Sequence, residues 1–132
     1  MCYTKNKTGK NKKTHKWFLD SAKYIAEISE QCAFAGYEPF LFPSFVKAFS
    51  KKLKNKGVIA NITTNGKLIK KFTDKQLKDT LKDITMVSIS YDSEKIKTIG
   101  DLVEFKESVK RLNKLNVRVG CNLLLNEGYL KV

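Results

Sequence analysis

Apolar residues recur along the chain with two different spacings, and each spacing predicts one kind of element. Apolar residues three or four positions apart, as at Phe18, Ala22 and Ile25, are typical of one face of a helix. Short apolar runs between these segments have the length of buried strands. The helices are expected to begin after Thr14, at Pro43, after Thr73 and after Asp101, and the strands to span residues 32–35, 58–63, 86–91 and 117–125.

Local signals support these boundaries. Thr73 and Gln76 have the spacing of a capping box, in which two side chains satisfy free backbone groups at a helix start. Gly57 and Asn116 lie where a left-handed residue can end a helix. The connections are too long for hairpins, so successive strands are expected to run parallel through right-handed crossovers. The predicted class is α/β, a partial (β/α) barrel with parallel strands that forms a single domain over residues 1–132.

The composition agrees with a single globular domain. Of 132 residues, 42% are apolar and 30% charged, which allows an ordinary core but is short for a closed barrel of about 200 residues or more. No apolar run approaches the roughly 20 residues that span a bilayer, and the basic start has no signal-peptide core. Three cysteines, at positions 2, 32 and 121, form no close-spaced pair. We therefore expect a cytoplasmic protein with no membrane partner and no disulfide framework.

A formal net charge of +13 raises the question of a nucleic-acid partner, because basic surfaces bind phosphate through counterion release. The kind of basic residue argues against a selected recognition surface. Only Arg111 and Arg118 are arginines among the 26 basic residues, whereas base recognition draws on the planar guanidinium. The excess of lysine and asparagine resembles a compositional bias, so nucleic acid stays an alternative that is not favoured.

Polar residues follow or interrupt each predicted strand. Glu38 lies in the turn after the first strand, Asn65 follows the second, and Asn122 lies in the last. On the third strand, Ser90 and Asp92 alternate with apolar residues and therefore share a face. Because the carboxyl ends of parallel strands lie on one side, these groups are expected to converge on one edge. The structural alternatives are ordinary turns and a half-solvated strand.

The order and spacing of these blocks resemble the radical S-adenosylmethionine (radical SAM) enzymes. In that family, a Cys-x-x-x-Cys-x-x-Cys loop after the first strand binds three irons of a [4Fe-4S] cluster and leaves the fourth iron for SAM. Met1, Cys2 and Tyr3 resemble the end of this loop, so the resemblance implies that Cys2 is a metal ligand. The first strand and two cysteines would then precede Met1, and the last unit or units of the barrel would also be missing. Alternatively, Cys2 is an incidental cysteine near a terminus.

The turn after the first predicted strand also resembles a family motif. Gly36, Tyr37, Glu38 and Pro39 are similar to the Gly-Gly-Glu-Pro motif that faces the methionine end of SAM. The resemblance implies that Glu38 accepts from the ammonium group, that Gly36 permits the turn and that Pro39 directs the exit. Tyr37 departs from the usual second glycine, and its side chain could crowd the ligand. The alternative is an ordinary turn between a strand and a helix.

The resemblance extends to three further strand ends. One carries the Thr-Asn-Gly that commonly closes the family's third strand, the next holds the ribose hydroxyls of SAM, and the last lies against its adenine. In chain order, the implied cofactor-binding residues are Thr64 and Asn65, then Ser90 and Asp92, then Gly120 and Asn122. Gly120 would let the flat base approach the backbone, and Asn122 could bond its polar edge.

The resemblance implies a radical SAM enzyme, in which a reduced cluster cleaves SAM to a 5′-deoxyadenosyl radical that takes hydrogen from a substrate. With one cluster cysteine, the 132-residue chain is expected to be inactive by itself. Nothing identifies the substrate, although the basic residues 5–16 suggest an anionic one. The alternative is a non-catalytic, basic α/β module that binds nucleic acid.

Overall fold

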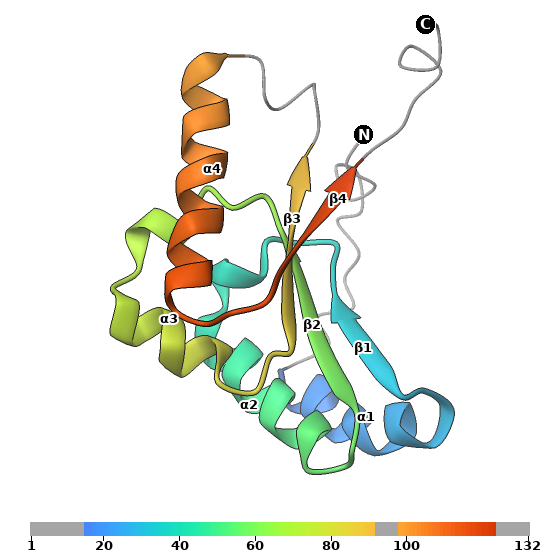
Figure 1. Ribbon diagram of the computed structural model, residues 1–132. Coiled ribbons are helices and arrows are strands. Elements are labelled where there is room, and N and C mark those ends of the chain that lie inside the picture. Colours follow the sequence, from blue (N-terminus) through green and yellow to red (C-terminus); the bar gives the residue numbers. More distant parts are fainter. Residues whose placement is uncertain (1–14, 92–97, 124–132) are drawn as a thin grey trace, which may run out of the picture.

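Helices and strands alternate along residues 15–91 and 98–123, which the computed structural model describes (Figure 1). The helices are α1 (His15–Ile28), α2 (Pro43–Lys54), α3 (Asp74–Leu81) and α4 (Ile99–Lys114). The strands are β1 (Gln31–Phe34), β2 (Ile59–Thr64), β3 (Met86–Tyr91) and β4 (Val119–Leu123). Two short 3-10 helices, η1 (Pro39–Leu41) and η2 (Ile69–Lys71), follow the first two strands.

The four strands form one parallel sheet in the order β1-β2-β3-β4. Each strand pairs with the next strand in the sequence, so every crossover brings the chain back beside the strand that it left. The register sets Thr63 beside Ser88, and Ser90 beside Asn122. The α/β class and the parallel strands expected from the sequence are therefore confirmed.

The helices pack on one face of the sheet, here called the covered face (Figure 1). From β2 and β3, the side chains of Ala60, Ile62, Val87 and Ile89 point to this face and are at most 1% exposed. They belong to two core clusters that also contain side chains from all four helices. The alternate residues form the open face, on which no helix of the described ranges packs. The open face consists of Ala33, Asn61, Thr63, Met86, Ser88, Ser90, Gly120 and Asn122.

Capping side chains define where two helices begin. Thr73 Oγ1 accepts a hydrogen bond from the Gln76 N–H at 3.2 Å, and Gln76 Oε1 accepts one from the Thr73 N–H at 2.8 Å. This pair confirms the predicted capping box at the start of α3. A second capping box joins Thr98 and Asp101, so α4 begins at Ile99, three residues before the expected start.

Two left-handed residues follow helices as expected. Gly57 has a φ of 77° after α2, and Asn116 has a φ of 60° after α4. The Val58 N–H donates to the Leu53 carbonyl at 3.0 Å, so Val58 still belongs to the helix ending and β2 begins one residue later than expected. The last strand begins at Val119 instead of residue 117, and positions 124 and 125 lie outside the described residues.

Candidate functional site

Polar side chains gather at the carboxyl edge of the sheet. The strands are parallel, so all of their carboxyl ends lie on this edge, and the turns after β1 and β2 contact each other there. Glu38, Thr64 and Asn65 come into direct contact, and Ser90 lies beside Asn122 in the register of β3 and β4. The structure therefore brings these sequence-predicted residues together on one edge, in two groups.

The first group is organised by the half-buried Glu38 carboxylate, which joins the two turns. Its Oε1 accepts hydrogen bonds from the Thr64 hydroxyl at 2.6 Å and from the Phe40 N–H at 3.3 Å. Its Oε2 accepts one from the Asn65 N–H at 3.0 Å. Each carboxylate oxygen can accept about two hydrogen bonds, so Oε2 has capacity for one more donor. Most of the acceptor capacity expected for an ammonium group is therefore used inside the protein.

The turn after β2 is held by its own side chains. Thr64 is 2% exposed and lies on the covered face, where its hydroxyl accepts from the Gly66 N–H at 3.0 Å. The amide oxygen of Asn65 accepts from the Lys67 N–H at 2.9 Å. Gly66 has a φ of 79°, and a Cβ there would lie 3.2 Å from Cγ2 of Ile89. Both the backbone conformation and the packing therefore require glycine at this position.

The turn after β1 needs a glycine for a different reason. Gly36 has a φ of 104°, but no atom lies within 4 Å of a Cβ built there, so conformation alone favours glycine. The side chain of Tyr37 extends into solvent, with 67% of the residue exposed. Pro39 is buried and begins η1, as its fixed φ allows. The residues of this motif thus shape the turn that presents Glu38.

The second group lies on the open face beside the same edge. Asn122 donates from Nδ2 to the Thr63 hydroxyl at 3.2 Å, across the intervening strand β3. Ser90 pairs with Asn122 in the register of the sheet. Ser88 pairs with Gly120, two residues nearer the amino ends of these strands. Hydroxyl and amide groups both donate and accept hydrogen bonds, so this surface can bind a polar ligand of either character.

Thr63 was not among the residues predicted from the sequence. The prediction named its neighbour Thr64, which the structure places on the covered face. The signal was present in the alternation of β2, because Thr63 lies between Ile62 and Thr64 and must point away from both. The residue that shares the open face with Ser90 and Asn122 is therefore Thr63.

Two further positions of the open face have unusual surroundings. A Cβ at Gly120 would lie 3.1 Å from Ser88 Oγ and 3.2 Å from Met86 Sδ, so glycine lets these side chains lie across β4. The Oδ1 atom of Asn61 is buried and has no hydrogen-bond partner within the described ranges. A buried acceptor without a donor costs about 1–3 kcal/mol. The open face therefore contains one polar group that the described residues leave unsatisfied.

The sequence did not predict a groove that lies beside the carboxyl edge, on the side of the helices. It has a volume of about 550 Å³ and runs between η2 and α4, with Asn65 and Ser90 among its lining residues. An ion pair between Lys70 and Glu104 joins η2 to α4 beside this groove. Phe105 contributes an apolar surface and packs edge-on against Tyr91, with ring centroids 5.3 Å apart.

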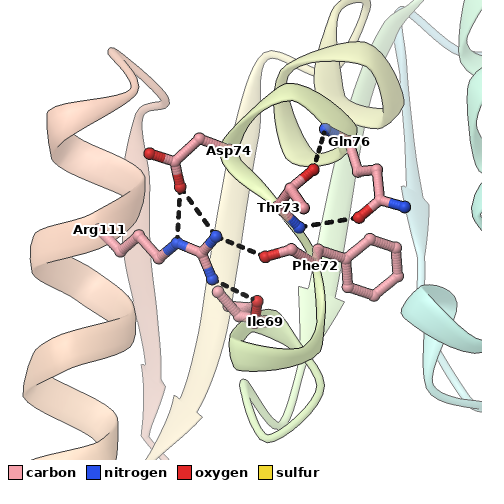
Figure 2. A network of polar contacts seen from close by, with 6 residues as sticks. All are labelled: Ile69, Phe72, Thr73, Asp74, Gln76 and Arg111. Atoms are coloured by element: carbon pink, nitrogen blue, oxygen red, sulfur yellow. Dashed lines mark hydrogen bonds and ion pairs between the residues drawn. The ribbon is translucent and has the colours of Figure 1, made fainter.

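Arg111 fixes the wall of this groove (Figure 2). Its Nη1 donates to the Ile69 carbonyl at 2.8 Å, and its Nη2 donates to the Phe72 carbonyl. The same guanidinium pairs with Asp74 through Nε at 2.9 Å and Nη2 at 2.8 Å. This planar fork links α4 to the turn before α3 and to Asp74, the first residue of α3. The sequence does not predict this role, because it depends on contacts at least 37 residues away.

The cysteines that the structure describes lie on the two outermost strands of the sheet. Cys32 is on β1 and Cys121 on β4, and two strands separate them. Neighbouring strands lie about 4.8 Å apart, so the two cysteines are too far from each other to share one metal ion. Burial raises the pKa of the Cys32 thiol, whereas Cys121 is exposed. The predicted metal ligand Cys2 and the predicted cofactor-binding residue Asp92 lie outside the described residues.

No protein-family model matches the chain, and a search of the curated proteins finds no matching protein. Within residues 15–91 and 98–123, no helix combines the length and apolar character needed to cross a membrane.

Proposed function

We propose that the chain is part of a radical SAM enzyme, and that the carboxyl edge of its sheet, with the adjoining open face, binds SAM. The observation that supports this most is a parallel sheet with helices on one face and hydroxyl and amide side chains on the other. Doubly wound sheets carry helices on both faces, whereas a barrel carries them only outside. The open face would then be the interior of a partial (β/α) barrel.

The proposed ligand contacts follow from the chemistry of each residue. Ser90 and Asn122 would bond the ribose hydroxyls and the adenine edge, because both side chains can donate and accept. Asp92 would bond the ribose hydroxyls together with Ser90. Glu38 would hold the two turns in position and offer the remaining capacity of Oε2 to the ammonium group of SAM.

An iron-sulfur cluster would depend on residues outside the described ranges. The described residues contain no group of three or more His, Cys, Asp or Glu side chains that could hold a metal ion. Cys2 would therefore contribute one thiolate, and further thiolates would have to come from another segment. When bound, such a cluster supplies the electron that cleaves SAM.

The SAM proposal is tested by titrating the ¹⁵N-labelled 132-residue chain with SAM and recording amide chemical shifts. We expect weak binding, near the millimolar range, because part of the ligand's surroundings would be missing. Shifts should concentrate at Gly66, Ser90, Gly120 and Asn122, at the carboxyl edge and on the adjoining open face. Shifts confined to the opposite edge, or none at millimolar SAM, would refute the assignment.

Matched variants connect the titration to the proposed contacts. A double variant with Ser90→Ala and Asn122→Ala should lose the shifts. The control Asn55→Ala, at the exposed end of α2 near the opposite edge, should keep them.

The cluster proposal has its own test. Anaerobic reconstitution of the 132-residue chain should leave no stoichiometric iron and sulfide, because one thiolate cannot hold four irons. In-frame codons for Cys-x-x-x-Cys-x before Met1 would support the family assignment, and a longer chain with them should bind a cluster. A stop codon directly before Met1 would count against it.

A further inference from the structure

The positive charge of the chain is unevenly distributed. Between positions 43 and 83 there are eleven lysines and three acidic residues, whereas positions 98–118 carry five basic and three acidic residues. The first of these segments contains α2 and α3, which lie side by side on the helix side of the sheet (Figure 1). Seven of these eleven lysines lie on α2, on α3 or at the C-cap of α3.

Each of these helices presents a row of lysines to solvent. On α2, three lysines stand at spacings of four and three, and on α3 and its C-cap, three more stand at spacings of three and four. These spacings put each row on one helix face, opposite to the buried residues such as Leu53 and Leu77. We call the two rows together the lysine face, which consists of Lys47, Lys51, Lys54, Lys75, Lys78 and Lys82.

The acidic residues of this region are already paired. Asp79 binds Lys47 at 2.6 Å and Asp83 binds Lys54 at 2.8 Å, and these two ion pairs connect α2 to α3 and to the turn that follows α3. The remaining acid, Asp74, pairs with Arg111 at 2.8 Å. The other four lysines of the lysine face are exposed and have no carboxylate partner among the described residues. They are Lys51, Lys75, Lys78 and Lys82.

We propose that the lysine face binds the phosphate backbone of nucleic acid. Four exposed ammonium groups without a carboxylate partner among the described residues are available to phosphates, and binding is favoured because it releases the counterions condensed on the nucleic acid. Lysine acts as a point charge and lacks the planar fork that reads base edges, so binding is independent of base sequence.

The composition of the lysine face favours nucleic acid over a lipid surface. Peripheral membrane helices insert aromatic or aliphatic side chains between their basic residues. On α2 and α3, the large apolar side chains point into the core, and among the described residues none of the strongly exposed ones comes from these helices. The lysine face is therefore suited to solvated phosphates and has nothing to insert into a bilayer.

This inference is independent of the proposed SAM site. The lysine face lies on helices that pack on the covered face, whereas Ser90 and Asn122 belong to the open face on the other side of the sheet. Nucleic-acid binding by the lysine face would hold for a non-enzymatic module as well as for an enzyme.

The test is fluorescence anisotropy of a labelled single-stranded RNA, and of the DNA of the same sequence, with the 132-residue chain over a range of salt concentrations. The test variant carries Lys51→Gln, Lys75→Gln, Lys78→Gln and Lys82→Gln. The control carries Lys23→Gln, Lys106→Gln, Lys110→Gln and Lys114→Gln, exposed lysines of α1 and α4, and so loses the same charge. Circular dichroism checks that both variants remain folded.

We expect the test variant to weaken RNA binding at least about tenfold at low salt. The slope of log K against log salt concentration should become shallower by roughly 3, as for four lost phosphate contacts on a single strand. The control should weaken binding less than about threefold. Equal weakening by both variants would mean that net charge alone acts, which would overturn the proposal. It would also be overturned by no binding at low salt, or by tighter binding to phosphatidylserine vesicles. RNA and DNA should bind alike, since only phosphates are contacted.

Discussion

The two faces of the same sheet differ more than the sequence of its strands suggests. On β3, Ile89 has no exposed surface and packs under the helices, whereas the adjacent Ser90 is only half-buried and lies on the open face. Successive side chains of a strand point to opposite faces, so neighbours in sequence enter different environments. The covered face holds the fold together, and the open face carries the groups that can bind a ligand. Each face can be tested separately.

The largest effect is expected from the covered face. Ile89→Ala should destabilise the protein by about 2–5 kcal/mol, because it removes buried apolar contacts and leaves a cavity. Ser90→Ala, one residue further on, should change the free energy of unfolding by no more than about 0.5 kcal/mol. Urea unfolding followed by circular dichroism measures both. Similar values for the two variants would show that both faces are packed alike.

Arg111 tests the link between the covered face and α4. Arg111→Met should cost roughly 2 kcal/mol, because the carbonyls of Ile69 and Phe72 lose charge-assisted hydrogen bonds. Arg111→Lys should restore little, since an ammonium group cannot reproduce the planar fork. The exposed Arg118→Met is the control and should have almost no effect in urea unfolding. Full rescue by lysine would indicate that charge alone matters.

At the edge between the faces, Glu38 and Thr64 should act as a coupled pair. Thr64→Val removes the hydrogen bond of 2.6 Å, and Glu38→Gln replaces its carboxylate acceptor by a neutral amide, so their effects on unfolding should not add. A double-mutant cycle should give a coupling of about 1–2 kcal/mol. Glu30→Gln, which changes an exposed carboxylate at the other edge, provides the matched control. Strict additivity would contradict the contact.

On the open face, one substitution should raise the stability of the protein. Asn61→Leu is expected to stabilise the isolated chain by about 1 kcal/mol, because it replaces a buried acceptor without a partner by an apolar group of similar size. Asn122→Leu should instead lose a small amount of stability together with its bond to Thr63. Thermal unfolding compares the two. Destabilisation by Asn61→Leu would mean that its oxygen has a donor.

The smallest effect concerns cysteine reactivity. In a Cys2→Ser background, Cys32 should react with iodoacetamide more slowly than Cys121 at neutral pH, because burial raises its thiol pKa and limits access. Because its pKa is raised, the Cys32 thiolate should form at a higher pH than the Cys121 thiolate, and its reaction should accelerate at a higher pH as well. Mass spectrometry of the two labelled peptides follows both rates. Equal pH profiles would contradict the burial of Cys32.

Several features followed from the sequence alone. Helix and strand periods, the Thr73 capping box and the left-handed Gly57 and Asn116 predicted most element boundaries within two residues. These signals are local, because they depend on residues within one or two helical turns. The parallel arrangement followed from connection lengths, and it placed the predicted polar residues on one edge.

Only the tertiary structure decided which groups meet across that edge. The alternation of β2 separates Thr63 from Thr64, but only the packing shows that Thr64 faces the helices and that Asn122 bonds Thr63 across β3. Glu38 holds Thr64 and Asn65, and Arg111 holds the turn that contains Ile69 and Phe72, 42 and 39 residues away. A one-residue shift in register exchanges the two faces of a strand, and such long-range contacts leave no periodic signal in the chain. The sequence therefore determined the elements and their order, and packing decided which side chains face one another.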